Sequence, residues 1–307
     1  MNDIAVLKQA LPYLRRHKKS TMVVKLGGEI AANAEALRSL SEDVSLLTHV
    51  GIRIVVVHGG GPQATEMQKR LGLEPVMVGG RRVTDEATLD VAKMVFAGKI
   101  NTDILSSLRR QGVSAVGLSG IDGDILHAKK RPPTEVLDPE TGQRRLVDFG
   151  LVGDVTAVDT ALVRLLLENK YVPVIASLAS DGSGNILNIN ADTVASVIAK
   201  DLGAAKLVIL TGVPGLLRDK NDPKSLVSRI TTEEAKAAMK DGTVAGGMLP
   251  KLRALVDAVE GGVERGHILS GTLPGALLLE LFTSAGSGTL IAEPDDVDEI
   301  VDGGPRG

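Results

Sequence analysis

The sequence predicts an α/β protein whose central sheet is mostly parallel. Short segments such as 22–26 and 52–57 are dominated by aliphatic residues, which is typical of strands that are covered on both faces. A stretch of helical character follows each of them, and glycines mark the points at which the strands end. Strands that alternate with helices in this way favour parallel pairing through helical crossovers.

The first half of the chain repeats a strand–loop–helix unit after an N-terminal helix. Residues 84–110 contain no proline and a single glycine, so one long helix is expected there. The charged, proline-bearing segment 122–155 predicts an irregular surface hairpin region. The other elements expected here are helices at 4–14, 33–49 and 63–71 and strands at 22–26, 52–57 and 113–118.

The second half continues the same alternation. A turn of small and polar residues at 180–184 suggests a boundary between two lobes near residues 180–200. Apolar segments bounded by glycine or proline then indicate the remaining elements. These are helices at 157–169, 191–202, 232–240 and 249–264 and strands at 171–177, 207–210, 267–270 and 289–292.

Composition excludes several classes of function. The 307 residues include 35 Lys+Arg against 38 Asp+Glu and only 2% aromatic residues, which argues against a nucleic-acid partner. The absence of cysteine excludes disulfides, thiolate metal sites and a cysteine nucleophile. An uninterrupted apolar run of about 18 residues is absent, so no membrane span is expected. The N-terminus does not resemble a secretory signal, and we expect a cytoplasmic protein.

Two glycine-rich loops follow consecutive predicted strands. The sequences KLGG at 25–28 and HGGG at 58–61 place flexible backbone at the carboxyl ends of strands, where ligands bind in open α/β sheets. Neither loop has the P-loop or dinucleotide pattern. The five histidines show no metal-ligand spacing, so no protein metal site is expected. Tight turns without a ligand remain the alternative, but the paired loops and the adjacent lysine favour anion binding.

Two further motifs place polar residues at predicted helix starts. The run NINAD at 188–192 has three polar residues, of which Asn190 or Asp192 could cap the helix, leaving the others for function. Lys251 follows the glycine pair 246–247 at another helix start, where a cation opposes the helix dipole. That penalty favours an anionic partner for Lys251, although a solvated lysine is the alternative.

Together these motifs resemble the amino acid kinase family. The resemblance runs from about residue 21 to 292 and rests on VVKLGG at 23–28, HGGGP at 58–62, GRRVT at 80–84, NINAD at 188–192 and GMLPK at 247–251. It implies a three-layer α/β/α sandwich with a mostly parallel central sheet. It also implies an acceptor-binding lobe at 21–200 and an ATP-binding lobe at 201–307.

The resemblance implies a reaction and a role for each matched residue. Within the family, the motifs are most similar to those of enzymes that phosphorylate the side-chain carboxylate of N-acetyl-L-glutamate with ATP, a step of arginine biosynthesis. A carboxylate is ionised at neutral pH, so the reaction needs no general base, and His58 is expected to be structural. Mg²⁺ would arrive with ATP, held mainly by phosphates and water. The implied residues are Lys25, Lys251 and Asp192 for catalysis, Gly60, Gly61, Arg82 and Asn188 for the acceptor, and Gly27, Gly28, Thr211, Gly212, Gly215 and Gly247 for ATP.

Two alternatives to this reaction stay open at the level of sequence. Another family member could act on carbamate, aspartate, glutamate or aminoadipate, and Arg81 lies beside Arg82 and could take its place at the acceptor. A non-enzymatic protein could keep the fold as an arginine-sensing scaffold. The presence of both lysines and of Asp192 favours an enzyme.

The N-terminal segment 1–20 predicts oligomerisation and regulation. Its apolar stripe has no place in the sheet, and an isolated helix of this length is marginal in water, so we expect it to pack either on its own domain or on another subunit. The sequence LPYL at 11–14 resembles the N-terminal extension of arginine-inhibited family members, which links dimers into a hexameric trimer of dimers. The resemblance implies arginine as a feedback inhibitor, although Ser270 departs from the aspartate expected beside Gly271. The implied effector residues are Tyr13, Lys206, His267, Glu280, Gly286 and Gly288.

Overall fold

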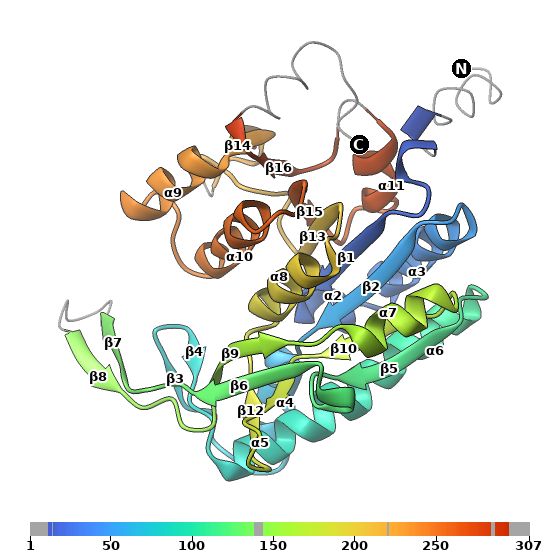
Figure 1. Cartoon of the computed structure of the whole chain (residues 1–307). Coiled ribbons are helices and arrows are strands. Elements are labelled where there is room, and N and C mark those ends of the chain that lie inside the picture. Colours follow the sequence, from blue (N-terminus) through green and yellow to red (C-terminus); the bar gives the residue numbers. More distant parts are fainter. Residues whose placement is uncertain (1–11, 14, 138–143, 220, 284–285, 295–307) are drawn as a thin grey trace.

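A computed structural model describes residues 12–13, 15–137, 144–219, 221–283 and 286–294 of the chain (Figure 1). The helix expected at 4–14 lies almost entirely outside these residues. Helical backbone is present at residues 12–13 and 15–17, directly before the first strand of the sheet.

The centre of the molecule is an eight-stranded sheet with the order β14-β16-β15-β13-β1-β2-β10-β5. All neighbouring strands are parallel except β15 and β16, which confirms the mostly parallel sheet. The strands are β1 (Thr21–Leu26), β2 (Arg53–His58), β5 (Ala115–Ser119), β10 (Val172–Ala176), β13 (Lys206–Thr211), β14 (Arg229–Thr231), β15 (Arg265–Ser270) and β16 (Thr289–Ala292).

Helices cover both faces of this sheet and give the three layers. Alternate residues of β1 enter different cores: Val23 is buried on one face of the sheet, whereas Met22 and Val24 are buried on the other. The face with Val23 is covered by α7 (Ala161–Glu168), α8 (Ala191–Leu202), α9 (Thr232–Lys240) and α10 (Met248–Glu260). The other face is covered by α2 (Gly28–Ala32), α3 (Ala34–His49), α4 (Gly61–Arg70), α5 (Glu86–Lys93), α6 (Asn101–Arg110) and α11 (Ala276–Phe282).

The long helix expected at 84–110 is present, but it is not uniform. A π-helical segment, η1 (Met94–Ile100), joins α5 to α6 and includes Gly98. Its buried side chains Phe96 and Ile100 face the loop after β2. The pattern predicted the length of this helix but not the π-helical segment within it.

The segment 122–155 is more ordered than the sequence predicted. The expected surface hairpin is β7 (Thr134–Leu137) with β8 (Arg144–Val147). The rest of the segment contributes β6 (Leu126–Lys130) and β9 (Gly153–Val158) to a second sheet with β11 (Leu178–Ser180) and β12 (Ile186–Asn188). Leu126 and Ala128 of β6 are buried, so this part is not a surface loop. Lys129 and Lys130, which follow them, concealed the short strand.

Several short elements escaped the sequence analysis. Besides the hairpin of β3 (Met77–Val78) with β4 (Arg81–Arg82), the strand β14 and the helix α11, the helix α2 and the strands β11 and β12 were also not predicted. The main sheet is continuous across the expected lobe boundary, because β13 pairs with β1 in register. The division into lobes at residue 200 therefore stays a prediction. None of the described helices is long and apolar enough to span a membrane.

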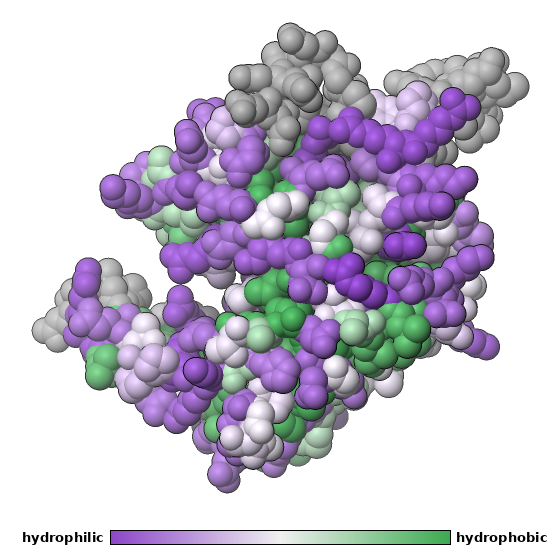
Figure 2. All heavy atoms as spheres, in the orientation of Figure 1, coloured by the Kyte–Doolittle hydropathy of each residue, from purple (hydrophilic) through white to green (hydrophobic). Residues whose placement is uncertain are grey.

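The visible face of the molecule is mostly hydrophilic, and it is hollowed on one side (Figure 2). The hollow lies between α9 and α10 on one side and the β7–β8 hairpin on the other (Figures 1 and 2). Lys251 is in the first turn of α10, one of the helices that border this hollow.

Candidate active site

Lys25, Asp192 and Lys251 meet at one carboxylate. The Lys25 Nζ lies 2.7 Å from Asp192 Oδ1, and the Lys251 Nζ lies 3.5 Å from Asp192 Oδ2. Lys25 comes from the penultimate position of β1, Asp192 from the first turn of α8 and Lys251 from the first turn of α10. The fold thus brings together the three residues that the sequence predicted for catalysis.

Asn190 explains how Asp192 becomes available to the lysines. The Asn190 side chain caps α8 by accepting hydrogen bonds from the backbone N–H of Asp192 at 2.7 Å and of Thr193 at 3.2 Å. The cap therefore does not use the Asp192 carboxylate. Of the two capping candidates left open by the sequence, the structure selects Asn190.

The ionisation of this cluster follows from burial and charge. Burial opposes the charge of Asp192, but the two lysines outweigh it and lower the pKa of the carboxyl group, so Asp192 is ionised at neutral pH. Burial also lowers the pKa of Lys25, and Asp192 opposes that effect. The side chain of Lys251 is 19% exposed, compared with 8% for Lys25, so its ammonium is the more accessible to a ligand.

Arg82 lies against the second glycine-rich loop. Its guanidinium donates hydrogen bonds to the Gly61 carbonyl at 2.8 Å, to Thr65 Oγ1 at 2.5 Å and to Gln68. Arg81, which directly precedes Arg82 in β4, is exposed and has Arg131, Arg253 and Asp154 as its charged neighbours. The structure thus brings Arg82, rather than Arg81, to the loop.

Asn188 reaches the same region from the last residue of β12. Its Nδ2 donates to Thr84 Oγ1 at 3.3 Å, and Thr84 follows the hairpin that carries Arg82. Asn188 therefore lies beside the segment that follows Arg82 in the chain.

The glycines of the two loops are needed for close packing. A Cβ atom on Gly60 would lie 2.8 Å from the Phe96 ring, and one on Gly28 would lie 2.8 Å from Pro62 Cδ. A Cβ on Gly61 would meet nothing within 4 Å, so Gly61 faces open space. The loop after β1 therefore packs directly on the loop after β2, and Gly61 borders the accessible region.

His58 fits the structural role expected for it. Burial lowers its pKa to about 4, so the ring is neutral at physiological pH. Nδ1 lies 2.9 Å from the Gly59 carbonyl oxygen and Nε2 lies 3.2 Å from Asn101 Nδ2. The carbonyl can only accept, which places the ring proton on Nδ1 and fixes the start of the loop.

Glu29 is a residue of the site that the sequence analysis missed. Its Oε1 accepts hydrogen bonds from the Gly212 N–H at 2.5 Å and from Thr211 Oγ1 at 3.1 Å. The carboxylate thus joins the loop after β1 to the loop after β13. No local pattern marks Glu29, because its partners are more than 180 residues away in the sequence.

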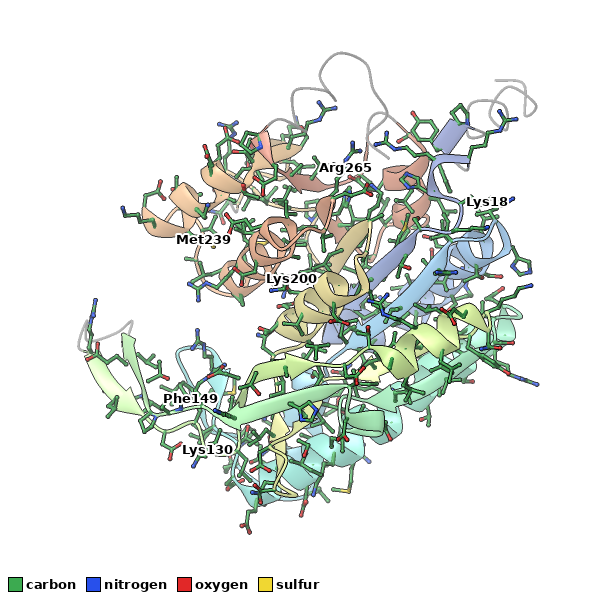
Figure 3. The ribbon with its side chains drawn as sticks, in the orientation of Figure 1. Lys18, Lys130, Phe149, Lys200, Met239 and Arg265 are labelled. Carbon is green, nitrogen blue, oxygen red and sulfur yellow. The ribbon has the colours of Figure 1, made fainter. Side chains whose placement is uncertain are left out.

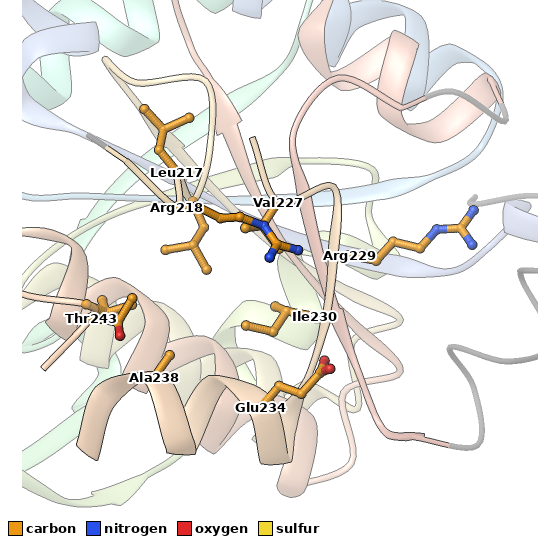
Figure 4. A pocket seen from close by; sticks show the side chains of 10 residues that line it. Leu217, Arg218, Val227, Arg229, Ile230, Glu234, Ala238 and Thr243 are labelled. Carbon is orange, nitrogen blue, oxygen red and sulfur yellow. The ribbon is translucent and has the colours of Figure 1, made fainter. Parts of the chain in front are cut away.

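A pocket of about 200 Å³ lies beyond the loop after β13 (Figure 4). Leu217, Val227, Ile230 and Ala238 line it, together with polar groups of Arg218, Glu234 and Thr243, whereas the Arg229 side chain extends away from it. Among the predicted ATP residues, Gly215 directly precedes Leu216, which lines the pocket. Gly247, the N-cap of α10, follows the lining residue Val244 by three positions. Among the described residues, no three histidine or acidic side chains converge as metal ligands.

Three of the predicted effector residues, Lys206, His267 and Glu280, form a second buried cluster near the amino end of β13. His267 Nδ1 lies 2.9 Å from Glu280 Oε1, and Glu280 Oε2 accepts from the Ser287 N–H at 2.6 Å. Lys206 is 1% exposed, and burial with Arg265 lowers its pKa to about 7, opposed by Glu280. In Figure 3, Arg265 lies toward the N-terminal segment and far from Lys130 beside the β7–β8 hairpin.

The other effector candidates lie in segments that adjoin this cluster. Gly286 has a φ of 67°, a left-handed conformation that favours glycine, and a Cβ on Gly288 would lie 2.7 Å from Leu269 Cδ2. Tyr13 is half-buried in the helical backbone before β1. The charge of Arg16, three residues later, contributes to the lowered pKa of Lys206, which places this segment near the cluster.

Comparisons with known proteins agree with this arrangement. The model of the amino acid kinase family matches residues 20–270. A relative from Methanothermobacter thermautotrophicus described as an acetylglutamate kinase is 44% identical over 95% of this chain and 100% of the relative. Another acetylglutamate kinase, from Symbiobacterium thermophilum, is 46% identical over 95% of this chain and 98% of the relative.

Solved structures extend the comparison. N-acetylglutamate synthase from Neisseria gonorrhoeae, complexed with coenzyme A and N-acetyl-glutamate, superposes with a TM-score of 0.80 at 29% identity. The match covers 95% of this chain and 64% of the synthase chain. A Giardia carbamate kinase has a TM-score of 0.62 at 19% identity, covering 89% of this chain and 99% of the kinase, and shares the fold alone. The chain belongs to the amino acid kinase family and, within it, to the acetylglutamate kinases.

Proposed function

We propose that this protein transfers the γ-phosphoryl group of ATP to the side-chain carboxylate of N-acetyl-L-glutamate, as a step of arginine biosynthesis. The observation that carries the proposal is the cluster in which one buried carboxylate holds two lysines from different elements. The names of the relatives support the choice of acceptor.

The residues of the cluster divide the chemistry between them. The acceptor carboxylate is ionised at neutral pH and attacks the γ-phosphorus without a general base. Lys25 and Lys251 stabilise the charge that spreads over the transferring phosphoryl oxygens, while Asp192 holds both ammonium groups in place. Mg²⁺, bound through the nucleotide phosphates, would supply further charge neutralisation.

The loop after β2 would hold the acceptor. Gly60 and Gly61 offer backbone groups, and Arg82 lies against Gly61 with a guanidinium that can bind a carboxylate through two hydrogen bonds. Asn188 lies beside the hairpin of Arg82 and would supply a further contact to the acceptor. This assignment makes the acceptor an acidic amino acid derivative.

The nucleotide is proposed to lie along the loop after β13. Its phosphates would approach Gly27, Gly28, Thr211 and Gly212, and its base would enter the apolar pocket beside Ile230 and Ala238. Mostly apolar walls with a few polar groups are typical of sites for small molecules and cofactors. Gly215 and Gly247 border this path.

The test of the activity is ATP turnover with N-acetyl-L-glutamate, compared with free glutamate, aspartate, aminoadipate and carbamate under the same conditions. We expect turnover to depend on the acetylated acceptor. Faster turnover with another acceptor would favour a different kinase of the family. Binding of arginine without turnover on any of these acceptors would favour the sensing scaffold.

We further propose that arginine inhibits the enzyme at the cluster of Lys206, His267 and Glu280 in a hexameric trimer of dimers. The match to N-acetylglutamate synthase complexed with coenzyme A and L-arginine supports an arginine site on this fold, with a TM-score of 0.78 and 27% identity over 98% of this chain and 70% of the synthase chain. Arginine would act by binding two states of the assembly with different affinity. The cytoplasmic location expected from the sequence stays a prediction.

Deletion of residues 1–20 tests this regulation. We expect active dimers with much weaker inhibition by arginine, measured by light scattering and by activity with added arginine. A deletion variant that remains hexameric with unchanged inhibition would contradict the proposal.

A further inference from the structure

Glu29 places an exposed carboxylate inside the phosphate region of the site. The side chain accepts from the Gly212 N–H at 2.5 Å and from Thr211 Oγ1 at 3.1 Å, and its charge attracts Lys25. Gly212 is packed closely on it, since a Cβ there would lie 2.9 Å from the Glu29 carboxyl carbon. These contacts hold the carboxylate at a backbone N–H that an incoming phosphate would also use.

The two acidic groups that attract Lys25 differ in how available they are. Asp192 is 4% exposed, and its two oxygens face Lys25 and Lys251. Glu29 is exposed, and its second oxygen takes part in neither of these two hydrogen bonds. Glu29 is therefore the carboxylate that a ligand meets when it enters the loop after β13.

A carboxylate at this position acts differently on the two forms of a nucleotide. A metal-free nucleotide presents only negative charge, so Glu29 repels its phosphates and competes with them for the Gly212 N–H. A magnesium complex presents a cation that prefers oxygen ligands and is commonly held by phosphates together with one or two carboxylates. The same side chain thus opposes the first form and favours the second.

We propose that Glu29 is a specificity-determining residue, which makes the phosphate site select the magnesium complex of the nucleotide over the free nucleotide. This inference rests on the proposed function, because it assumes that phosphates lie between Lys25 and Gly212. It assigns to the chain's own carboxylate a preference that the positive charges of Lys25 and Lys251 cannot supply, since they attract both forms of the nucleotide.

The test compares ADP affinity with and without the metal in the full chain and in Glu29→Gln. Isothermal titration with ADP in excess Mg²⁺ and with ADP in EDTA gives two dissociation constants, and their ratio is the selectivity for the metal complex. Gln keeps an oxygen that accepts from Gly212 but removes the charge, so metal-free ADP should bind more tightly. We expect the ratio to fall by about tenfold or more.

Glu35→Gln is the matched control, because Glu35 is also exposed in the first turn of a neighbouring helix, α3. It should keep the wild-type ratio. An unchanged ratio in Glu29→Gln, or an equal fall in both variants, would overturn the inference while leaving nucleotide binding intact. Wild-type protein that binds neither form of ADP would instead overturn the proposed function and this inference with it. Equal unfolding temperatures of the variants establish that folding does not explain the result.

Discussion

Two buried charge clusters of this protein lie toward opposite ends of neighbouring strands of the sheet and are balanced differently. At the carboxyl ends, Asp192 contacts both Lys25 and Lys251, and the attraction keeps the carboxylate ionised. At the amino end of β13, Lys206 lies among Arg265, His267 and Glu280, and its pKa falls to about 7. In the first cluster the two lysines lower the pKa of the carboxyl group, whereas in the second cluster burial and a like charge lower the pKa of the lysine to about 7.

The comparison predicts that changes in the first cluster affect turnover most. Lys251→Ala should lower kcat and kcat/KM together by about 100-fold or more, with little change in acetylglutamate binding, because the ammonium acts mainly on the transferring phosphoryl group. Steady-state kinetics and acceptor titration measure the two effects. Lys240→Ala, at an exposed position at the end of α9, should be neutral. Normal turnover of Lys251→Ala would remove this lysine from the mechanism.

Asp192→Asn should combine a loss of turnover with a loss of stability. It leaves Lys25, with 6% exposure, without its charge partner, and breaking a buried ion pair in this way costs about 3–5 kcal/mol. Chemical denaturation gives the change in the free energy of unfolding. Asp201→Asn, at an exposed position near the end of α8, is the control. Equal stability of Asp192→Asn and the wild type would mean that the carboxylate does not hold Lys25.

Arg82→Lys should raise the acceptor KM by about tenfold with a smaller effect on kcat. An ammonium cannot reproduce the two parallel hydrogen bonds of a guanidinium to a carboxylate. Arg81→Lys is the matched control on the same hairpin, because Arg81 has other charged neighbours. A raised KM in Arg81→Lys alone would assign the acceptor contact to the other arginine.

The smallest effect on turnover is expected from Lys206→Met, in the second cluster, where the change is one of stability with pH. The folded pKa of Lys206 is lowered from 10.5 to about 7, so the folded state binds fewer protons than the unfolded state between these values. This group therefore makes wild-type stability rise with pH from about 7 to 10.5, and its stabilising share is lost as pH falls through 7. Lys206→Met should flatten that rise, measured by denaturation across the range. An unchanged slope would show that Lys206 does not titrate there.

The sequence predicted the parts of the fold and site that depend on local pattern. Aliphatic segments gave β1, β2 and β13, and the helix expected at 191–202 is α8 with the same bounds. Lys25, Asp192 and Lys251 could be found because each lies in a motif of its own. Whether Asn190 or Asp192 caps α8 could not be decided, because both residue types form caps and only their tertiary partners differ.

The features that escaped depend on contacts between distant segments. The role of Glu29 depends on its hydrogen bond from Gly212, which directly follows β13, and β13 lies beside β1 only in the fold. The strands β6 and β9 stabilise one another, and their charged neighbours conceal their short apolar faces. The effector residues were proposed from a resemblance, and no local pattern would have joined His267 to Glu280.

The pairing of β13 limits how its two ends can influence each other. All six residues of the strand are buried, and β1 and β15 pair with it in register on either side. If β13 slid by one residue against β1 and β15, Leu207 and Ile209 would turn to the opposite face of the sheet, so the strand cannot shift along its own axis. Any structural coupling between Lys206 and Thr211 would therefore require a change in the twist of the sheet or a rigid movement of the layers. The two residues are separated by roughly 17 Å of strand.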